Sequence, residues 1–563
     1  MIPSHFMKVD TIPVKSNGKL DRNALPKPEI SDIARTYEEP TNEVEAALCL
    51  AMQTVLNIER IGINDDFYEM GGDSLSSMEL LISSALPGLD IACIFRGRTP
   101  CKIAQLYMQQ IQNRDPSGDE ELNDYAKREE HKLTPEQLDF FNYQSYMPGS
   151  TMYNLFDMFR FDKNDIDPER MVMAVEMALK NHPALRTVLQ YNEKGELIQK
   201  YDSKMQIVVT PEKISEDELN KIKDTLVAPF KIINSPMFRF RLFETEKAIY
   251  LFLNVHHIVF DGTSLAILLK TVMDAYIGAP LETDYYYLAL TRRKQMELTD
   301  FYEESRQYHE NAYGNVKWTT YPKIDKKPEE NKLGCLSCNE TVSPIYISSA
   351  EKKFMVSRNE FFIAATLLAI AINTGKNDVQ VSWIYNGRDD LASTNSVGLL
   401  CRELSVALRL HSKTALRDVF ADIHEQVRNG IKYSCYPYMA NLPQNEDGDI
   451  TCVIYQREIG GSEDFGGMNV NRVKIAHNDA AAQSILDVQI FDSNDGLRYV
   501  FDYAAGRYEE ETMTEFQILF RSVIAAIVNS SNTDGYNLKQ LKKDVLGKKG
   551  LKQKIKGIFA KKK

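Results

Sequence analysis

Two adjacent histidines followed by an aspartate and a glycine form the pattern with the clearest chemical potential in this sequence. The stretch is His256-His257-Ile258-Val259-Phe260-Asp261-Gly262. A neutral imidazole can accept a proton from an attacking nucleophile, or hold that nucleophile by a hydrogen bond. A pair of buried histidines satisfied by the backbone would explain the same residues, so the stretch alone leaves both interpretations open.

The flanking residues predict a strand, a turn and a helix that would position this pattern. The apolar run 249–255 is typical of a buried strand, and residues 263–276 place apolar side chains at helical spacing. Asp261-Gly262 supplies the turn between them. We therefore expect the two imidazoles at a strand end, close to a carboxylate held by a tight turn.

A serine at position 74 is the second candidate for chemistry. It follows Gly71-Gly72-Asp73 and precedes an amphipathic stretch, 76–86. The glycine pair allows a sharp entry into a helix, where a phosphodiester on the serine would gain from free N–H groups and the helix dipole. Simple N-capping is the commoner role for such a serine.

The composition excludes several classes of protein. A chain of 563 residues, 43% of them hydrophobic, has room for three or four domains with real cores. The net charge of −12 argues against a general nucleic-acid binder. No apolar run reaches the roughly 18 residues of a membrane span, and the first residues do not resemble a secretory signal. Eight scattered cysteines fit a reducing cytoplasm, and the lone Cys335-x-x-Cys338 pair does not predict a metal site.

The order of patterns along the chain predicts three structured parts. Four helices within 38–112 predict a small bundle, and the polar stretch 113–130 predicts a flexible linker. Residues 131–540 mix strands and helices, which predicts an α+β unit. Because that unit is too large for one core, we expect two lobes, at about 131–305 and 306–540.

The histidine pattern resembles the signature of condensation domains of nonribosomal peptide synthetases, which belong to a chloramphenicol-acetyltransferase-like superfamily. Four other stretches resemble further motifs of that family: 133–137 (LTPEQ), 182–187 (HPALRT), 385–388 (YNGR) and 397–400 (VGLL). The resemblance implies two acetyltransferase-like lobes with a tunnel between opposite faces. The histidine motif would lie near the floor of that tunnel.

The resemblance also implies roles for individual residues. His257 matches the histidine described as general base or as positioner of the nucleophile, whereas we expect His256 to pack structurally. Asp261 would tie the turn to an arginine, for which Arg388 is the candidate. Gly262 would let the backbone approach the reacting centre, and its N–H would help to hold the developing oxyanion. Arg186, in the second motif, is expected to support the site.

Residues 66–75 (DFYEMGGDSL) resemble the attachment site of 4′-phosphopantetheine in peptidyl carrier domains. By this resemblance 38–112 is such a domain, and Ser74 carries the cofactor as a swinging thiol arm. An apolar patch that partner domains recognise is expected at four residues, Leu75, Met78, Ile94 and Phe95.

The first 28 residues resemble the C-terminal end of an adenylation domain. Residues 12–22 are similar to its closing motif, and Lys19 matches the lysine that contacts the acyl phosphate. The rest of such a domain is absent, so Lys19 is expected to be an inherited feature that does not work here. An upstream adenylation domain and a phosphopantetheinyl transferase are expected partners.

Three departures from the family pattern leave the substrates open. The family usually has arginine where this chain has Asp139 and Asn181, and the tyrosine-rich stretch 284–287 lacks an expected tryptophan. The nucleophile type, and so the choice between an amide and an ester product, is not decided by the sequence.

The predicted function is transfer of a carrier-bound aminoacyl or peptidyl group to an acceptor amine, which forms an amide bond. No second carrier follows, so the acceptor is expected to be a free amine or a residue on the carrier of a partner. One alternative is an epimerisation domain, which usually has tryptophan where Leu265 follows Ser264. Another alternative is an inactive condensation-like scaffold that gates the carrier.

The lysine-rich end, 541–563, leaves three interpretations open: docking to an acidic partner, contact with an anionic membrane, or a disordered solubilising tail. The chain is expected to act as a monomer in the cytoplasm.

Overall fold

The computed structural model describes residues 37–112 and 129–547, apart from short gaps at 57, 59, 69, 71–76, 78–79, 82, 85, 87–88, 90, 315, 327–332, 340–341, 389–390, 442–449, 460–464, 466–469, 476–483, 494–495 and 531–534. The predicted adenylation remnant with Lys19, Ser74 and most of the predicted linker lie outside the described residues.

The N-terminal part is a small helical unit around one core. Its helices α1 (Glu43–Leu56), α3 (Ile91–Gly97) and α4 (Pro100–Gln112), with helical residues between 77 and 83, enclose a cluster of buried apolar side chains. Pro100 begins α4, since proline suits the first helical position. Asn42 caps α1, because its Oδ1 accepts the Glu45 N–H at 2.9 Å.

The prediction of a partner-binding patch is wrong for one of its four residues. Ile94 is fully buried among the core side chains of this helical unit. The side chains of Leu75, Met78 and Phe95 lie outside the described residues.

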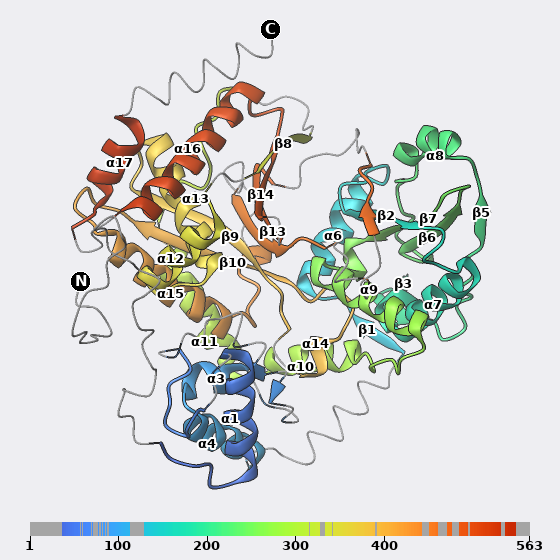
Figure 1. Ribbon diagram of the computed structural model, residues 1–563, viewed down its shortest axis with the longest axis horizontal. Helices are drawn as coiled ribbons and strands as arrows, with labels where there is room; N and C mark the ends of the chain where they lie inside the picture. Colours follow the sequence, from blue (N-terminus) through green and yellow to red (C-terminus); the bar gives the residue numbers. More distant parts are fainter. Residues whose placement is uncertain are drawn as a thin grey trace, which may run out of the picture.

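A five-stranded sheet forms the N-lobe, on the right in Figure 1. Its strand order is β12 (Val470–Arg472), β2 (Asn154–Asp162), β7 (Ala248–His256), β6 (Phe238–Glu244) and β5 (Pro211–Lys213). Every residue of β7 is buried, as its apolar run predicts. Helices α7 (Pro168–Asn181) and α9 (Gly262–Ile277) share the main core of this lobe.

A six-stranded sheet forms the C-lobe. Its order is β10 (Arg402–Arg409), β9 (Asp378–Tyr385), β11 (Thr451–Arg457), β13 (Leu486–Ser493), β14 (Gly496–Ala504) and β8 (Leu333–Asn339). Helices α13 (Arg358–Thr374), α15 (Leu416–Lys432) and α16 (Glu510–Asn529) cover one face and complete its core. The opposite face is turned toward the N-lobe (Figure 1).

The remaining elements frame these two sheets. A three-stranded sheet has the order β1 (Glu130–Lys132), β4 (Leu197–Tyr201) and β3 (Thr187–Tyr191). The other helices are α6 (Pro135–Tyr146), α8 (Glu216–Ile222), α10 (Tyr286–Met296), α11 (Asp300–Tyr313), α12 (Pro344–Phe354), α14 (Leu391–Thr394) and α17 (Leu538–Leu546). Short 3₁₀ turns occur at η3 (Pro183–Arg186), η4 (Lys223–Thr225), η5 (His257–Val259) and η6 (Met439–Asn441).

The predicted division into lobes at residue 305 is wrong in two places. Helix α11 belongs to the C-lobe, where the Tyr313 hydroxyl donates to the Ser405 carbonyl at 2.8 Å. The chain later returns to the N-lobe, because β12 pairs with β2 and Phe465 joins the N-lobe core. The lobes are therefore not consecutive along the sequence.

Two helix predictions also need correction. The stretch 349–373 predicts one helix, but α12 ends at Phe354 and is followed by Met355, which has a left-handed backbone (φ 55°). Helix α13 then begins with a capping box of Ser357 and Glu360. The predicted tail from 541 starts inside the fold, since Leu541 and Val545 of α17 are buried in the C-lobe core.

Among the described helices, none is by itself long and apolar enough to span a membrane. Taken together, α12 and α13 have suitable length and composition, but the two are bent by 89°.

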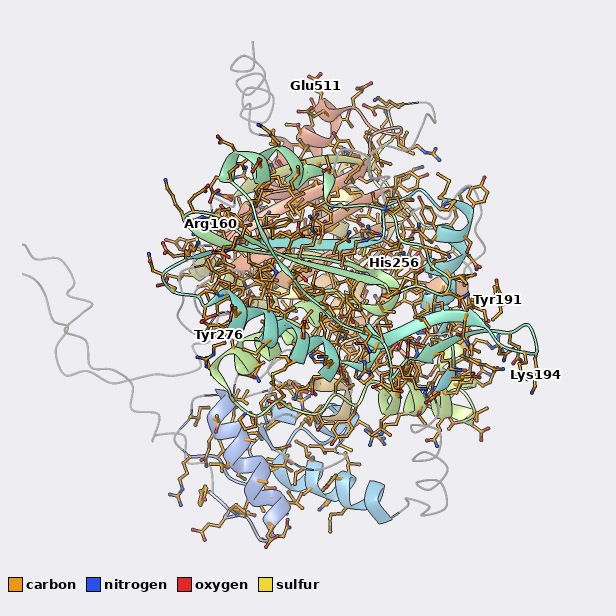
Figure 2. All side chains as sticks on the ribbon, turned by 90° about the vertical axis from the view of Figure 1, so that its right-hand side faces the viewer. Arg160, Tyr191, Lys194, His256, Tyr276 and Glu511 are labelled. Atoms are coloured by element: carbon orange, nitrogen blue, oxygen red, sulfur yellow. The ribbon has the colours of Figure 1, made fainter. Side chains whose placement is uncertain are left out.

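The helical unit lies below the two lobes in both views (Figures 1 and 2). It approaches helix α15 of the C-lobe. Burial raises the pKa of Tyr68, and the positive charge of Arg428 on α15 opposes that rise. Likewise, the hydrogen bond to Glu360 raises the pKa of His424 on α15, and the positive charge of Arg98 in the helical unit opposes that rise.

Candidate functional site

The histidine motif lies at a junction of strand, turn and helix, as the sequence predicts. Strand β7 ends at His256, the 3₁₀ turn η5 follows, and α9 begins at Gly262. Two hydrogen bonds hold the turn: the Ile258 N–H donates to His256 Nδ1 at 3.1 Å, and the Ser264 N–H donates to Asp261 Oδ1 at 2.8 Å. Asp261 is thus the N-cap of α9.

His257 is held from its backbone and packed through its ring. Its N–H donates to the Tyr153 carbonyl at 2.8 Å, and its ring centroid lies 5.0 Å from that of Phe140. The side chain is half-buried. Burial lowers the pKa of His257, although the nearby Asp261 carboxylate opposes this shift. The imidazole is therefore neutral at pH 7, which is the form that can accept a proton.

His256 has the surroundings of a structural residue. It is fully buried, its Nε2 lies 3.3 Å from Gln144 Oε1, and its ring packs edge-on against Phe230. Burial lowers the pKa of His256 to about 3, so it stays neutral. Figure 2 labels it in the N-lobe, which faces the viewer there.

The ion pair between Asp261 and Arg388, which the sequence predicts, is present and joins the two lobes. The two terminal nitrogens of Arg388, Nη1 and Nη2, donate to the two carboxylate oxygens at 2.9 and 3.0 Å, and both side chains are only 1–2% exposed. The backbone N–H groups of Leu400 and Cys401 donate to the same carboxylate at 3.1 Å. Burial would raise the pKa of Asp261, but Arg388 holds it below its ordinary value.

Ser264 adds a second connection between the lobes that sequence reasoning missed. Its Oγ lies 2.8 Å from Asp261 Oδ1 and accepts the Gly398 N–H at 3.0 Å. Arg388 also donates to this oxygen, at 3.1 Å. A serine two residues after the Asp-Gly turn, at the third position of a helix, was the available signal.

Two glycines allow the crossing segments to pack at this junction. Gly387 has a positive φ of 66°, and a Cβ there would overlap the carbonyl oxygen of Leu400. A Cβ on Gly398 would overlap the ring of Tyr286. Only glycine fits at either position.

Gly262 differs from these two, because no described protein atom crowds it. A Cβ there would meet only Gln456 Oε1 of β11, at an ordinary 3.5 Å. Because Gln456 belongs to the C-lobe, Gly262 faces the space between the lobes.

A buried polar network fixes the wall behind the turn. Gln137 Nε2 on α6 donates to the Ile258 carbonyl at 3.0 Å and lies 3.3 Å from the Tyr286 hydroxyl. His182 Nδ1 lies 2.7 Å from Asp284 Oδ2, and that oxygen accepts the Val397 N–H at 3.0 Å. The motifs at 133–137, 182–187 and 397–400 therefore meet around the turn.

Arg186 is placed by the structure at the small sheet. Its guanidinium lies 5.1 Å from the centre of the Tyr201 ring and donates to the Ser203 carbonyl. Neither contact involves His257. Asn181, a departure from the family pattern, donates to the Glu282 carbonyl at 2.9 Å.

A pocket of about 380 Å³ opens on the N-lobe next to His256. Gln144 and Phe230, which contact His256, belong to its lining, with Ser145, Pro148, Pro229, Lys231, Ile232 and Ile233.

The described residues on either side of Ser74 fit the attachment of a phosphopantetheine arm. Helical residues follow at Ser77, Leu80 and Leu81, and the Ser77 hydroxyl lies 2.9 Å from that of Tyr68. Asp66 is held by Arg98 at 2.7 Å in the preceding turn. A serine hydroxyl just ahead of helical residues has the chemistry that a phosphodiester bond to the arm requires.

Comparison with known proteins identifies both parts of the chain. The family model "Condensation domain" matches residues 127–543, and the family model "Phosphopantetheine attachment site" matches residues 46–83.

Curated relatives are large synthetases. Bacitracin synthase 3 of Bacillus licheniformis is 25% identical over 533 residues, which are 91% of this chain and 8% of that protein. Gramicidin S synthase 2 of Aneurinibacillus migulanus is 22% identical over 556 residues, which are 94% of this chain and 12% of that protein. The chain thus spans a small fraction of these relatives.

Solved structures share the two-lobed fold. The X-domain in the complex of the X-domain and OxyB from teicoplanin biosynthesis is 16% identical, with a TM-score of 0.61, over 74% of this chain and 96% of that one. The first condensation domain of the CDA synthetase is 17% identical, with a TM-score of 0.59, over 73% of this chain and 98% of that one. Because the condensation model matches well over half of the sequence, the chain belongs to the condensation-domain family, with its chloramphenicol-acetyltransferase-like fold, and carries a phosphopantetheine-binding carrier domain ahead of it.

Proposed function

We propose that this chain forms amide bonds: an aminoacyl or peptidyl group borne by the arm on Ser74 is transferred to an acceptor amine beside His257. The observation that carries the proposal is a neutral, half-buried imidazole, held at the β7–α9 turn. That turn is itself clamped from the other lobe by Arg388. When bound to Ser74, the arm supplies the thiol that carries the donor acyl group.

His257 orients the acceptor amine and accepts its proton as the new bond forms. General-base help of this kind contributes roughly 10²–10⁴-fold to a rate. Holding two reactants in place contributes a comparable or larger effect. The backbone contact from Tyr153 and the ring contact from Phe140 limit the freedom of the imidazole, which favours the positioning role.

The Gly262 N–H is proposed to stabilise the oxyanion that develops on the acyl carbonyl. Gly262 is the first residue of α9, where helix geometry leaves the N–H without an intrahelical acceptor. The positive end of the helix dipole adds to the attraction for negative charge. The uncrowded space at Gly262 leaves room for the substrate.

The proposed partners follow from the family. The carrier and condensation domains act with adjacent domains and carrier partners; we propose an upstream adenylation domain, a phosphopantetheinyl transferase, and an acceptor that is either a carrier-bound residue or a free amine. All eight cysteines are free thiols, which supports the proposal of a reducing, cytoplasmic location.

The test starts with the full chain. A phosphopantetheinyl transferase and an aminoacyl-coenzyme A would load it, free amines would be offered, and mass spectrometry would follow the products. We expect an amide product from the wild type and no loading of Ser74→Ala. Deuterium exchange at Cα without an amide would instead indicate an epimerisation domain. Normal loading with neither outcome would indicate a gating scaffold.

A further inference from the structure

One amide side chain of the C-lobe sheet points toward the N-lobe. In strand β11, Val453 and Tyr455 pack into or against the helix-covered core of the C-lobe. Since consecutive side chains of a strand point to opposite faces, Ile454 and Gln456 lie on the face that is turned toward the N-lobe (Figure 1). Both of these side chains are half-buried. Gln456 therefore places a polar group between the lobes.

The strand order brings Gln456 to the turn that carries the histidine motif. Strands β9 and β11 are parallel neighbours, so both end at the same edge of the sheet. The segment after β9 contains Arg388, whose guanidinium binds Asp261. Gln456, near the end of β11, meets the next residue of that turn, Gly262. The ends of the two strands therefore face adjacent residues of one turn.

The distance between Gln456 and Gly262 suits two groups that bind one atom. A Cβ added to Gly262 would meet Gln456 Oε1 at 3.5 Å. Because a Cβ lies about 2.5 Å from its own backbone nitrogen, Oε1 is no more than about 6 Å from the Gly262 nitrogen. Two donors that share an oxygen are separated by up to about 6 Å, since each hydrogen bond is about 2.9 Å long. The geometry is therefore compatible with one oxygen that contacts both groups.

Neither of these groups has a partner within the described part of the chain. The Gln456 side chain and the Gly262 N–H form no hydrogen bond there. The neighbouring Asp261 carboxylate, by contrast, is fully occupied by Arg388 and by backbone N–H groups. A carboxamide offers two N–H donors and an oxygen acceptor. The Gln456 amide is therefore available to a ligand that enters between the lobes.

The neighbours of Gln456 hold its backbone in place. The Tyr455 hydroxyl donates to Asp492 Oδ2 at 2.6 Å, and Arg358 Nη1 donates to the same oxygen at 2.6 Å. On the other side, the Glu458 N–H donates to the Asp492 carbonyl at 2.8 Å. A donor that is fixed in advance needs little reorganisation when charge develops on its acceptor. Gln456 thus has the supports that such a role requires.

We infer that the Gln456 amide donates a hydrogen bond to the carbonyl oxygen of the donor acyl group, together with the Gly262 N–H. This inference rests on the proposed function, in which that N–H holds the developing oxyanion. Sites of this kind use backbone N–H groups, Asn or Gln side chains, or both. The amide oxygen and nitrogen exchange places by a half-turn about the last side-chain bond, and no hydrogen bond in the described structure fixes one of them toward Gly262.

The two donors act on charge that appears only during the reaction. As the amine nitrogen bonds to the acyl carbon, an electron pair moves onto the carbonyl oxygen, and the amine proton passes to His257. The pair then returns, the carbon–sulfur bond breaks, and the proton passes from His257 to the released sulfur. Because Gln456 and Gly262 belong to different lobes, the site is complete only at the lobe spacing that the Asp261–Arg388 pair holds.

Single-turnover kinetics of the loaded full chain test this role. Gln456→Met keeps the length of the side chain but removes the amide, and we expect it to lower the maximal rate of amide formation about 10²-fold. The amine concentration that gives half of that rate should not change, because the lost contact is to the donor group. Gln456→Glu has no N–H to donate at pH 7, so it should lose as much. Gln307→Met, the same change at an exposed position of α11, should leave the rate unchanged.

Infrared spectroscopy gives a readout that needs no turnover. A phosphopantetheinyl transferase and a coenzyme A derivative with an isotope-labelled acyl carbonyl would load Ser74, and no amine would be added. A hydrogen bond to a carbonyl lowers its stretching frequency. We therefore expect a band at lower frequency in the wild type, which Gln456→Met loses and Gln307→Met keeps.

The outcomes separate this inference from the proposed function. A wild-type rate in Gln456→Met or Gln456→Glu would overturn the inference, and so would a slow rate that accompanies a lowered urea midpoint, since that indicates a structural role. If the wild type forms no amide with any amine, the proposed function fails, and the infrared band alone decides the role of Gln456. A shifted band that is missing from the wild type, or kept by Gln456→Met, would then overturn the inference.

Discussion

At the scale of single residues, two neighbouring histidines differ because their surroundings differ. His256 is sealed and bonded on both nitrogens, whereas His257 is only half-buried. Sequence reasoning predicted this difference only through the family resemblance. No local pattern distinguishes two adjacent imidazoles until the strand end and the turn are placed.

The pH dependence of catalysis should reflect the lowered pKa of His257. Because burial lowers it from the ordinary 6.5, the base stays neutral, and therefore competent, at and somewhat below pH 6.5. We expect kcat/KM, corrected for the neutral fraction of the acceptor amine, to be constant from pH 8 to 6.5 and to fall only below that range. If the corrected kcat/KM had already fallen to half its maximum at pH 7, the pKa of His257 would not be lowered, and the prediction would be wrong.

Loss of Arg388 should destabilise the protein strongly. Arg388→Met leaves Asp261 as a buried unpaired charge, which costs about 3–5 kcal/mol of unfolding free energy. Glu212→Gln is the matched control, because it breaks an exposed pair with Arg241 and should cost at most about 1 kcal/mol. Urea denaturation measures both; similar losses would show that the inter-lobe pair has no special role.

The sequence identified this ion pair but not its neighbours. Asp261 and Arg388 stand in motifs, whereas Ser264, Tyr286 and Gln456 reach the junction only through the fold. A serine inside a helix and a tyrosine in an aromatic-rich stretch are ordinary in sequence. Their roles arise from long-range contacts, and only the position of Ser264 just after the Asp-Gly turn gave a local signal.

At the scale of elements, the crossing loop after β9 depends on Gly387. Gly387→Ala combines a positive φ with overlap of the Leu400 carbonyl, so we expect a loss of about 3 kcal/mol. Gly375→Ala has the same positive φ but open space, and should cost about 1 kcal/mol. Equal losses in thermal or urea unfolding would mean that the close approach to Leu400 is unimportant.

Burial of Asp487 on β13, with Asp502 opposite it on β14, should make stability depend on pH. The pKa of Asp487 rises from 3.8 to about 7 in the folded state, so the folded chain holds a proton that the unfolded chain releases. Stability from this group therefore falls as pH rises from about 4 to 7.

Asp487→Asn removes that penalty. The variant should match the wild type near pH 4 and exceed it at pH 8 by an amount on the order of 2–4 kcal/mol. Glu246→Gln serves as the surface control in urea unfolding at both pH values. No gain at pH 8 would show that burial, with the Asp502 charge opposite, does not raise the pKa of Asp487 in the folded chain.

Element predictions succeeded where the pattern was local and failed where tertiary context decided. The all-buried run of β7, the turn and α9 are all present as predicted. The break between α12 and α13 depends on one left-handed residue, Met355, inside a stretch that otherwise continues with helix-forming residues. The stretch from 541 reads as a charged tail because lysines dominate it up to 563, and within α17 three lysines alternate with the two leucines and the valine that it buries.

At the scale of the whole molecule, the two lobes are interlocked rather than joined by a single hinge. Strand β12 returns from the C-lobe part of the chain to pair with β2, and the Asp261–Arg388 pair bridges the lobes at the turn between β7 and α9. Such a crossing strand is only three residues long, so its sequence carries no usable signal. The lobe division was therefore predicted as linear, and wrongly.

The most direct test of the central claim is a single-turnover measurement on the loaded full chain. Wild type, His257→Ala and His256→Gln would each be loaded on Ser74 and mixed with a saturating free amine, and amide formation would be timed by quenched-flow mass spectrometry. The account predicts that His257→Ala loads normally but forms amide at least about 10²-fold more slowly, with an unchanged unfolding transition. Amide formation by a folded His257→Ala chain at the wild-type rate would contradict it.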